Sequence, residues 1–320
     1  MIIKPTDKRI RFSERWQITD ASAVCTAPGN YFEFIFSGNM AVMEFNTDNC
    51  RDPYPHLYIK VDDGARIESP IDKYLRITTI PGTHRVEVIL KSAVEAHHRW
   101  YAPLVAKAEL VGIAADAFGE LAPDNRKTIE FIGDSITEGV LINPEKEKFK
   151  DVRDRVFQDD STATYAWLTA EALNLRPIIM GYGAVGTTRS GSGAVPKVAE
   201  SYPFYSFQNP MPSANADYIV INHGTNDASA APELVDKEYS AFLELVRERN
   251  PHSKIIALTP FGGFHAELIE KVVENHNKKH NDSVYYINST GWVPREPIHP
   301  ERDGHKIVAK HLTEELKKIL

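Results

Sequence analysis

Hydrophobic and polar residues alternate along six short segments in the first third of the chain. These segments, which are separated by turn-forming residues, are 31–38, 40–48, 56–62, 73–80, 84–93 and 104–112. Alternation with a period of two is typical of strands that bury one face, and Asp62-Asp63-Gly64 and Pro81-Gly82-Thr83 have the composition of turns. Because no helical pattern lies between the segments, they predict an antiparallel β-sandwich with a jelly-roll-like arrangement.

The pattern changes after Ala114. Strands are expected near 128–132, 177–181, 217–222, 254–259 and 284–288, and helices at 162–173, 232–249, 264–279 and 302–319. Strands that alternate with helices predict an α/β domain with a parallel sheet. Gly119 and the Pro123-Asp124-Asn125 sequence mark a linker between the two patterns. We therefore expect a β-sandwich domain in residues 1–120 and an α/β domain in residues 121–320.

The first strand of the α/β region runs into the turn Gly133-Asp134-Ser135-Ile136-Thr137-Glu138-Gly139. A serine at the carboxyl end of a parallel strand, in a turn that leads into a helix, is exposed to ligand. Its N–H can face developing negative charge. Such a serine is a candidate nucleophile. For the Gly-Asp-Ser tripeptide alone, the simpler interpretation is a turn in which Asp or Ser caps a helix.

Three further polar blocks follow in chain order. Gly181–Thr188 and Asn222–Asp227 each come after an apolar run, and Glu296-Pro297-Ile298-His299 precedes the last amphipathic stretch. With four blocks in this order, the chain resembles an SGNH hydrolase of the GDSL esterase superfamily over residues 125–320. The resemblance implies a flavodoxin-like, three-layer α/β fold around a parallel sheet.

The same resemblance assigns roles residue by residue. It implies that Ser135 is the nucleophile, that His299 is the general base, and that Ser135, Gly186 and Asn226 form the oxyanion hole. The chain departs from the family pattern at Glu296, where the family has Asp three residues before the histidine. Glu296 is therefore the candidate third member of a triad, and a backbone carbonyl that orients His299 is the alternative.

The proposed chemistry requires these residue types. A serine hydroxyl is a poor nucleophile until a base within hydrogen-bond reach takes its proton, and imidazole can accept that proton and return it to the leaving alcohol. The oxyanion of the tetrahedral intermediate needs preorganised donors. The turn around Ser135 lacks the Gly-x-Ser-x-Gly pattern of ordinary α/β-hydrolases.

A β-sandwich followed by an SGNH domain is similar to carbohydrate esterase family 2, whose members remove acetyl groups from sugars. This similarity implies a serine esterase that deacetylates an O-acetylated carbohydrate through an acyl-enzyme. A short-chain lipid or thioester hydrolase is one alternative. A non-catalytic ligand-binding protein on the same fold is the other, and the intact set of Ser135, Asn226 and His299 argues against it.

Two regions outside these blocks have open interpretations. The β-sandwich either forms a wall of the cleft, with Trp100 and Tyr101 as exposed aromatic residues for a sugar, or is a structural appendage. The charged stretch Asn143–Asp160 either arches over the cleft or is a solvated surface excursion. Trp292, which precedes the base, either flanks the acyl pocket or packs in the core.

Composition limits the partners. The 320 residues are 42% hydrophobic and 25% charged, as in ordinary globular proteins, and the net charge of −7 gives no basic field for nucleic acid. No apolar run approaches the ~18 residues of a membrane span, and the N-terminal residues lack the apolar stretch of an export signal. We expect a cytoplasmic protein whose partner is a small-molecule or oligosaccharide ester, and leave open a homo-oligomer.

No cofactor is expected, and the histidines do not indicate a metal. His299 and His305 lack a third ligand at metal-site spacing, and no Cys-x-x-Cys occurs. We interpret His305 as a buried or capping residue of the last helix. His223 precedes Gly224, and packing in the core and a position in the cleft are equally open interpretations for it.

Overall fold

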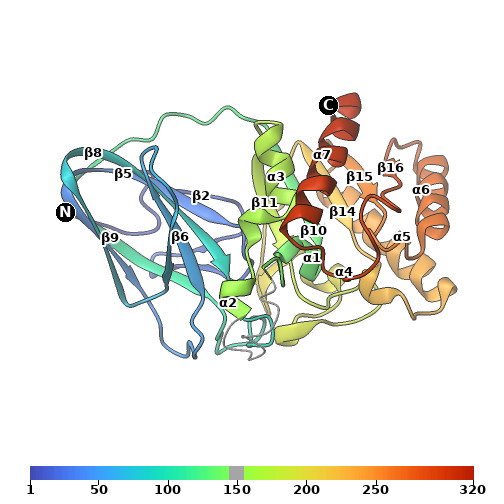
Figure 1. The fold of residues 1–320 in the computed structure, drawn as a ribbon, viewed down its shortest axis with the longest axis horizontal. Coiled ribbons are helices and arrows are strands. Elements are labelled where there is room, and N and C mark those ends of the chain that lie inside the picture. The colour runs from blue at the N-terminus through green and yellow to red at the C-terminus, as the bar shows by residue number, and fades with distance from the viewer. Residues whose placement is uncertain (144–154) are drawn as a thin grey trace.

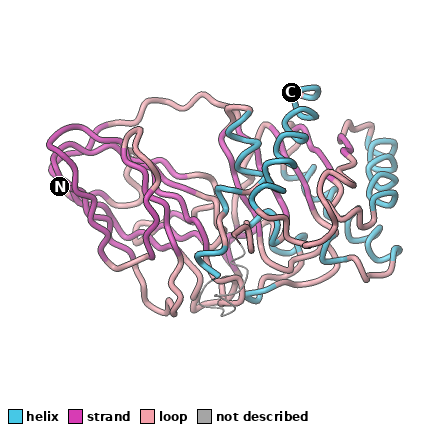
Figure 2. Tube along the Cα trace, viewed as in Figure 1, coloured by secondary structure: helices cyan, strands magenta, loops and turns pink. Residues whose placement is uncertain are grey.

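Two sheets lie side by side in the computed structural model, which describes residues 1–143 and 155–320 (Figure 1). The antiparallel sheet is built from strands up to Gly119, and the parallel sheet begins at Thr128. Strands dominate the first part and helices gather around the second, as Figure 2 shows. The predicted fold class, an antiparallel β-structure followed by an α/β fold, is confirmed. The exact division into residues 1–120 and 121–320 stays a prediction.

Within the described residues the antiparallel sheet has nine strands, and its two longest members organise it. β5 pairs with β8 on one side and with β2 and β9 on the other. The strands are β1 (Ile2–Ile3), β2 (Arg11–Phe12), β3 (Gln17–Ile18), β4 (Ala23–Cys25), β5 (Tyr31–Phe45), β6 (His56–Val61), β7 (Ile67–Pro70), β8 (Tyr74–Ser92) and β9 (Ala108–Gly119). Phe32, Phe34 and Phe36 alternate along β5 and are fully buried, as the period of two predicts.

Two predicted pairs of strands are each one continuous strand. The segments 31–38 and 40–48 merge into β5, and 73–80 and 84–93 merge into β8. The turn predicted at Pro81-Gly82-Thr83 is therefore wrong. Gly82 pairs with Gly38, and the register shifts beside them, so these residues mark a bulge in the pairing rather than a chain reversal.

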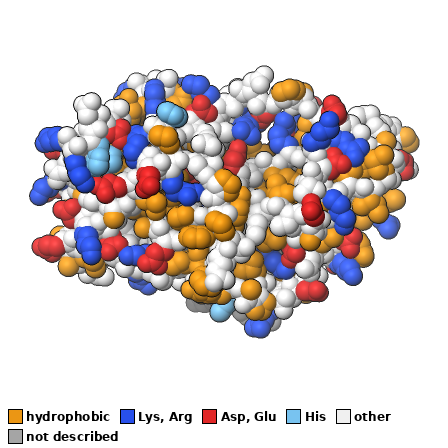
Figure 3. Space-filling model, turned by 180° about the vertical axis from the view of Figure 1, so that it is seen from behind, with side chains coloured by type: hydrophobic (Ala, Val, Ile, Leu, Met, Phe, Trp, Pro, Cys, Tyr) orange, Lys and Arg blue, Asp and Glu red, His pale blue; other side chains and the backbone are white. Residues whose placement is uncertain are grey.

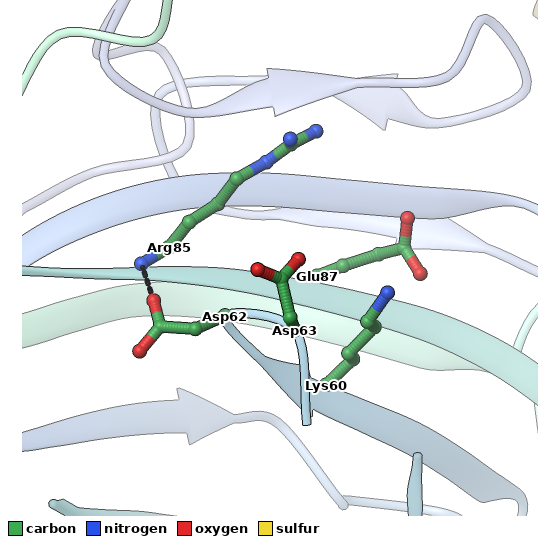
Figure 4. Close-up of a pocket in the computed structure, with 5 residues that line it drawn as sticks. All are labelled: Lys60, Asp62, Asp63, Arg85 and Glu87. Carbon is green, nitrogen blue, oxygen red and sulfur yellow. Dashed lines mark hydrogen bonds between the residues drawn. The ribbon is translucent and has the colours of Figure 1, made fainter. Parts of the chain in front are cut away.

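The outer face of β6 and β8 is polar and carries a pocket of about 280 Å³, whose lining residues are drawn in Figure 4. Lys60 lies opposite Glu87 across the strand pair, and the Arg85 N–H donates to Asp62 at 2.8 Å. Opposite charges that face each other in this way stabilise a solvated sheet surface. On the face shown in Figure 3, basic and acidic side chains are likewise interspersed.

The parallel sheet has the strand order β11-β10-β14-β15-β16, which is the 2-1-3-4-5 order of flavodoxin-like folds. Its strands are β10 (Thr128–Gly133), β11 (Arg176–Gly181), β14 (Tyr218–Asn222), β15 (Lys254–Leu258) and β16 (Tyr285–Ile287). A separate short hairpin is formed by β12 (Phe204–Ser206) and β13 (Asn209–Pro210). In this order β10, which leads to Ser135, lies in the interior of the sheet, where ligands bind at the carboxyl ends of such strands.

Helices cover both faces of this sheet. Along β14, Tyr218 and Val220 pack with α3 (Tyr165–Ala172) and α7 (Arg302–Ile319), whereas Ile219 and Ile221 belong to the core on the opposite face. The opposite face is covered by α5 (Pro232–Arg249) and α6 (Ala266–His280). The predicted three-layer arrangement is thus confirmed. None of the helices in the described part of the chain is long and apolar enough to cross a membrane.

The remaining helical elements of the described residues are short. They are α1 (Ser135–Glu138), α2 (Arg155–Gln158), α4 (Val198–Ser201) and the 3₁₀ turns Ser161–Ala163, Ser192–Ala194 and Thr225–Asp227. Most of the charged stretch Asn143–Asp160, for which an arch over the cleft and a solvated surface excursion are the two interpretations, lies outside the described residues, at 144–154.

The antiparallel sheet covers the edge of the parallel one. β11 is an edge strand, and the buried Asn30 side chain donates to the Ile179 carbonyl at 2.7 Å while accepting its N–H at 3.4 Å. Asn30 therefore replaces a neighbouring strand at this edge, which would otherwise expose unpaired backbone groups. Buried side chains of both sheets belong to one continuous hydrophobic cluster.

We expect Asn30→Ala to destabilise the protein by at least about 2 kcal/mol, because a buried backbone group left unpaired costs about 1–3 kcal/mol. Urea unfolding followed by circular dichroism measures this change. The exposed Asn125 provides the control, and Asn125→Ala should stay within about 0.5 kcal/mol of the parent. Equal stabilities for the two variants would contradict the role assigned to Asn30.

Candidate active site

Ser135 lies where the sequence places it, at the first position of α1 directly after β10. The Asp134 side chain caps this helix by accepting the Ile136 N–H at 2.9 Å. α1 then ends at Gly139, whose φ of 94° is in the left-handed region that glycine adopts without strain. The capping interpretation of the tripeptide therefore holds for Asp134, and it leaves the serine hydroxyl free to meet a base.

The structure brings Ser135 and His299 together, although they are 164 residues apart in sequence. Nε2 of His299 lies 2.9 Å from Oγ of Ser135. Burial lowers the pKa of His299 below its usual value, the nearby Glu95 carboxylate opposes this shift, and Arg155 reinforces it. A neutral imidazole next to a hydroxyl is the state that can accept the hydroxyl proton.

Asp134 and Asn226 join two of the polar turns. Nδ2 of Asn226 donates to Oδ2 of Asp134 at 3.2 Å and to the Val185 carbonyl at 3.1 Å. The Asn226 amide thus lies beside the Ser135 turn. Burial raises the pKa of Asp134 to about 7, and its place at the turn is structural rather than reactive.

Gly186 lies in a loop that Asp227 holds. The Asp227 carboxylate accepts the backbone N–H and hydroxyl of both Thr187 and Thr188, at 2.6–3.1 Å. A Cβ on Gly186 would lie 2.5 Å from Oδ1 of Asp227, so this position has no room for a side chain. The Gly186 N–H donates to the Arg189 carbonyl at 3.0 Å. Its role as an oxyanion donor stays a prediction, and it requires this N–H to leave or share that carbonyl.

Glu296 is not brought to His299. Its carboxylate is exposed, and within residues 1–143 and 155–320 it makes no hydrogen bond or ion pair. Nδ1 of His299 likewise has no hydrogen-bond partner in the described part of the chain. The assignment of Glu296 as the third member of a triad therefore stays a prediction that this geometry does not support.

The other predicted residues have packing roles. His305 is fully buried, accepts the Tyr165 N–H at 3.0 Å and stacks on the Tyr165 ring, and burial lowers its pKa to about 3. His223 is fully buried and lies edge-on to Phe242, and burial lowers its pKa to about 4, so packing is the role the structure gives it. Trp292 stacks on His311 beside the core.

The aromatic pair expected on the sandwich surface is only half present. Trp100 is buried and packs edge-on against Phe204, so its predicted exposure is wrong. Tyr101 is exposed, and its ring centroid lies 4.8 Å from that of the exposed Phe207. The residue before Trp100, Arg99, is also buried, in an ion pair with Glu138.

Three charged residues near the site are not among the functional residues that the sequence predicts. Glu95 and Arg99 come from the segment between β8 and β9, and Glu138 ends α1. Arg99 forms a bidentate ion pair with Glu138, and Glu95 pairs with Arg155 at 2.8 Å. Glu138 lies within the Gly133–Gly139 motif. Glu95 and Arg99 lie in no motif, so a prediction of their place at the site would require knowing which distant segments of the chain come into contact. Among the described residues, no group of three His, Cys, Asp or Glu side chains could hold a metal ion.

A family model for GDSL-like lipases and acylhydrolases matches residues 131–307, which is more than half of the chain. The chain belongs to the GDSL-like lipase/acylhydrolase family. This match spans the Ser135 turn, the Gly186 loop, the Asn226 turn and His299.

Relatives resemble this family member along nearly its whole length. An acetylxylan esterase/glucomannan deacetylase from Cellvibrio japonicus is 25% identical over 346 residues, covering 99% of this chain and 91% of that protein. The structure of a family two carbohydrate esterase from Cellvibrio japonicus matches with a TM-score of 0.83 at 21% identity, covering 100% and 97% of the two chains. A family two carbohydrate esterase from Clostridium thermocellum in complex with cellohexaose matches with a TM-score of 0.77 at 20% identity, covering 97% and 98%. The two-part fold is therefore shared with these structures.

The charges around His299 predict a shift in its titration. The negative charge of Glu95 favours imidazolium, so Glu95→Gln should lower the pKa of His299 further below 6.5. An NMR titration of the His299 ring measures this shift. Glu120→Gln, which removes an exposed carboxylate paired with Lys8 at 3.5 Å, is the matched control and should leave the titration unchanged. A pKa that rises in Glu95→Gln would refute the predicted sign.

Proposed function

We propose that this protein is a serine esterase that removes acetyl groups from an O-acetylated carbohydrate through an acyl-enzyme. The observation that carries the proposal is the 2.9 Å contact between Nε2 of His299 and Oγ of Ser135 at the first turn of α1. Membership of an acylhydrolase family supports the reaction class. The full-length similarity to an acetylxylan esterase/glucomannan deacetylase supports the acetyl group and the carbohydrate.

In the first step, Oγ of Ser135 attacks the acetyl carbonyl carbon and its proton passes to Nε2 of His299. The carbonyl oxygen becomes an oxyanion in the tetrahedral intermediate. When the intermediate collapses, the bond between the acetyl carbon and the sugar oxygen breaks, and His299 returns the proton to that oxygen. The sugar leaves as an alcohol, and an acetyl-Ser135 ester remains.

In the second step a water molecule hydrolyses the acetyl-Ser135 ester. His299 takes a proton from a water molecule whose oxygen attacks the acetyl carbon, and the same proton then returns to Oγ of Ser135 as acetic acid leaves. His299 must be neutral at the start of both steps. The burial that lowers the pKa of His299 supports this requirement, because it disfavours imidazolium.

The oxyanion donors proposed are the Ser135 N–H, the Asn226 amide and the Gly186 N–H. The Ser135 N–H, at the first position of α1, makes no hydrogen bond to another described residue, and helix N-termini favour negative charge. The Asn226 amide lies beside the Ser135 turn, where its two N–H groups donate to Asp134 and to the Val185 carbonyl. The Gly186 N–H donates to the Arg189 carbonyl, so Asn226 and Gly186 must each leave or share a present acceptor to bind the oxyanion.

The antiparallel sheet is proposed to form a wall of the cleft rather than an appendage. The segment between β8 and β9 places Glu95 against Gly183, where a Cβ would lie 1.9 Å from its carboxylate, and near enough to His299 to affect its charge. Residues 1–120 and 121–320 are proposed as the two domains that share this cleft. The cytoplasmic location and self-association stay predictions.

A panel of esters tests the proposed function. We expect acetate release from acetylated mono- and oligosaccharides, with little hydrolysis of long-chain p-nitrophenyl esters. Ser135→Ala should remove both turnover and labelling by a fluorophosphonate, while Ser283→Ala, at an exposed serine, should retain both. Preferred hydrolysis of long acyl chains would support the lipid-hydrolase alternative. Absence of labelling and of turnover in the parent protein would support the non-catalytic one.

Glu296→Gln separates a triad from a dyad. Because the Glu296 carboxylate is exposed and unpaired, we expect kcat to fall by less than about tenfold, whereas His299→Ala should nearly abolish turnover. Loss of a carboxylate that orients the base costs about 10⁴ in kcat in the Ser-His-Asp arrangement. A loss of 10²–10⁴ in Glu296→Gln would therefore establish Glu296 as the third member.

A further inference from the structure

A buried ion pair connects the antiparallel sheet to the helix that carries Ser135. Nη2 of Arg99 donates to Oε2 of Glu138 at 2.9 Å, and Nη1 donates to Oε1. Both side chains are almost completely removed from solvent. Arg99 comes from the segment between β8 and β9, and Glu138 is the last residue of α1. A fixed two-point contact therefore joins the nucleophile helix to a segment that precedes the α/β region.

The same carboxylate also holds the turn that leads to Gly186. Oε2 of Glu138 accepts the Gly183 N–H at 2.6 Å. The other side of this turn is also fixed, because the Gly183 carbonyl accepts the Ser192 N–H at 2.8 Å and the Arg99 N–H donates to the Gly193 carbonyl at 3.1 Å. The main chain of Arg99 thus contacts this loop directly, and its side chain contacts the loop indirectly, through Glu138.

Close packing accompanies these hydrogen bonds. A Cβ on Gly181 would lie 2.4 Å from the Glu138 nitrogen, so the backbones of α1 and the turn touch. The Arg99 guanidinium lies over the Tyr182 ring, 5.0 Å from its centroid, and completes the packing. A shift of the Glu138 carboxylate would therefore move both α1 and the turn before Gly186.

We propose that Arg99 is a positioning residue for the catalytic centre, which acts through Glu138 to hold the Ser135 helix and the Gly183 turn in register. The inference rests on the proposed function and deepens it. It assigns to one residue outside the α/β region the task of aligning the nucleophile with the loop that carries a proposed oxyanion donor. Such alignment affects rate more than binding, because it matters most in the transition state.

The chain contains a matched control for this pair. Arg15, which also precedes the α/β region, is buried and pairs with the buried Glu130 at 2.7 Å, and its guanidinium lies over the Tyr202 ring. The second carboxylate oxygen of Glu130 accepts the Tyr202 hydroxyl at 3.1 Å rather than a backbone N–H of a catalytic turn. Both are buried Arg–Glu pairs. They differ in that Arg15 donates through Nη2 to one carboxylate oxygen while Arg99 donates through both Nη atoms, and in that the Glu138 carboxylate also accepts the N–H of a catalytic turn.

The test compares two double replacements, Arg99→Met/Glu138→Met and Arg15→Met/Glu130→Met. Replacing both members of a buried ion pair by apolar side chains is often tolerated, whereas removing one member leaves an unpaired charge. Circular dichroism monitors folding, and the readouts are kcat and KM for an acetyl ester and the rate of fluorophosphonate labelling. We expect the Arg99/Glu138 replacement to lower kcat and the labelling rate at least tenfold with KM within threefold, and the control replacement to leave all three within twofold.

Equal effects of the two double replacements would overturn the proposal, because the pair would then be an ordinary structural contact. If either double variant fails to fold, Arg99→Lys is compared with Arg15→Lys, since lysine retains the charge and loses the two-point fork. A fall in kcat of threefold or more for Arg99→Lys alone supports positioning, and equal kcat values contradict it.

Hydrogen exchange of the Gly183 amide gives a readout that needs no activity. Its protection should fall in the Arg99 variants and persist in the Arg15 variants, because Glu138 accepts this N–H and Glu130 does not. If the parent protein hydrolysed no ester, the proposed function would fail, while this exchange measurement would still decide the positioning role. Unchanged protection in the Arg99 variants would reject that role even in an active esterase.

Discussion

The close backbone contact between α1 and the ends of β10 and β11 is the constraint on which the site depends. Gly133 and Gly181 pair in register at the end of these strands. A Cβ on Gly133 would lie 2.0 Å from Oγ1 of Thr137, and one on Gly181 would lie 2.4 Å from the Glu138 nitrogen. Both glycines are needed because α1 lies directly on the strand ends. Ser135 therefore has a fixed position at the carboxyl ends of the parallel strands, where the other polar turns also lie.

The α/β half of the fold follows from local patterns, whereas the antiparallel half depends on pairing between distant strands. Each predicted strand of the parallel sheet is a short apolar run, and α5, α6 and α7 each have an apolar face with a helical period. In β5 and β8 the local signals mislead, because Gly38 and Pro81-Gly82 form a bulge between paired strands instead of two turns. A glycine and a proline in a row are compatible with both structures, and only the partner strand distinguishes them.

The same difference between local patterns and long-range pairing explains which residues of the site can be predicted from the sequence. Ser135, Asn226 and His299 lie in short motifs, and the structure brings the serine and the histidine into contact. Arg99 and Glu95 lie in no motif, since their function depends on a segment that folds back onto α1 and the Gly183 turn. Glu296 was found from its spacing to His299. Spacing places residues near each other along the chain, and it does not determine where their side chains point.

The absence of a carboxylate at Nδ1 of His299, in the part of the chain that the structure describes, is consistent with the electrostatics of the site. A carboxylate bonded to Nδ1 stabilises imidazolium and raises the pKa of the base. Here burial is the largest influence on His299 and lowers its pKa, while Glu95 and Arg155 act in opposite directions and are paired with each other. Their pairing limits how much either charge changes the base. The neutral form of His299 is therefore maintained mainly by the low polarity of its surroundings. Glu95 comes from the segment between β8 and β9 and Arg155 from α2, so each part of the molecule supplies one of the two opposing charges that act on the base.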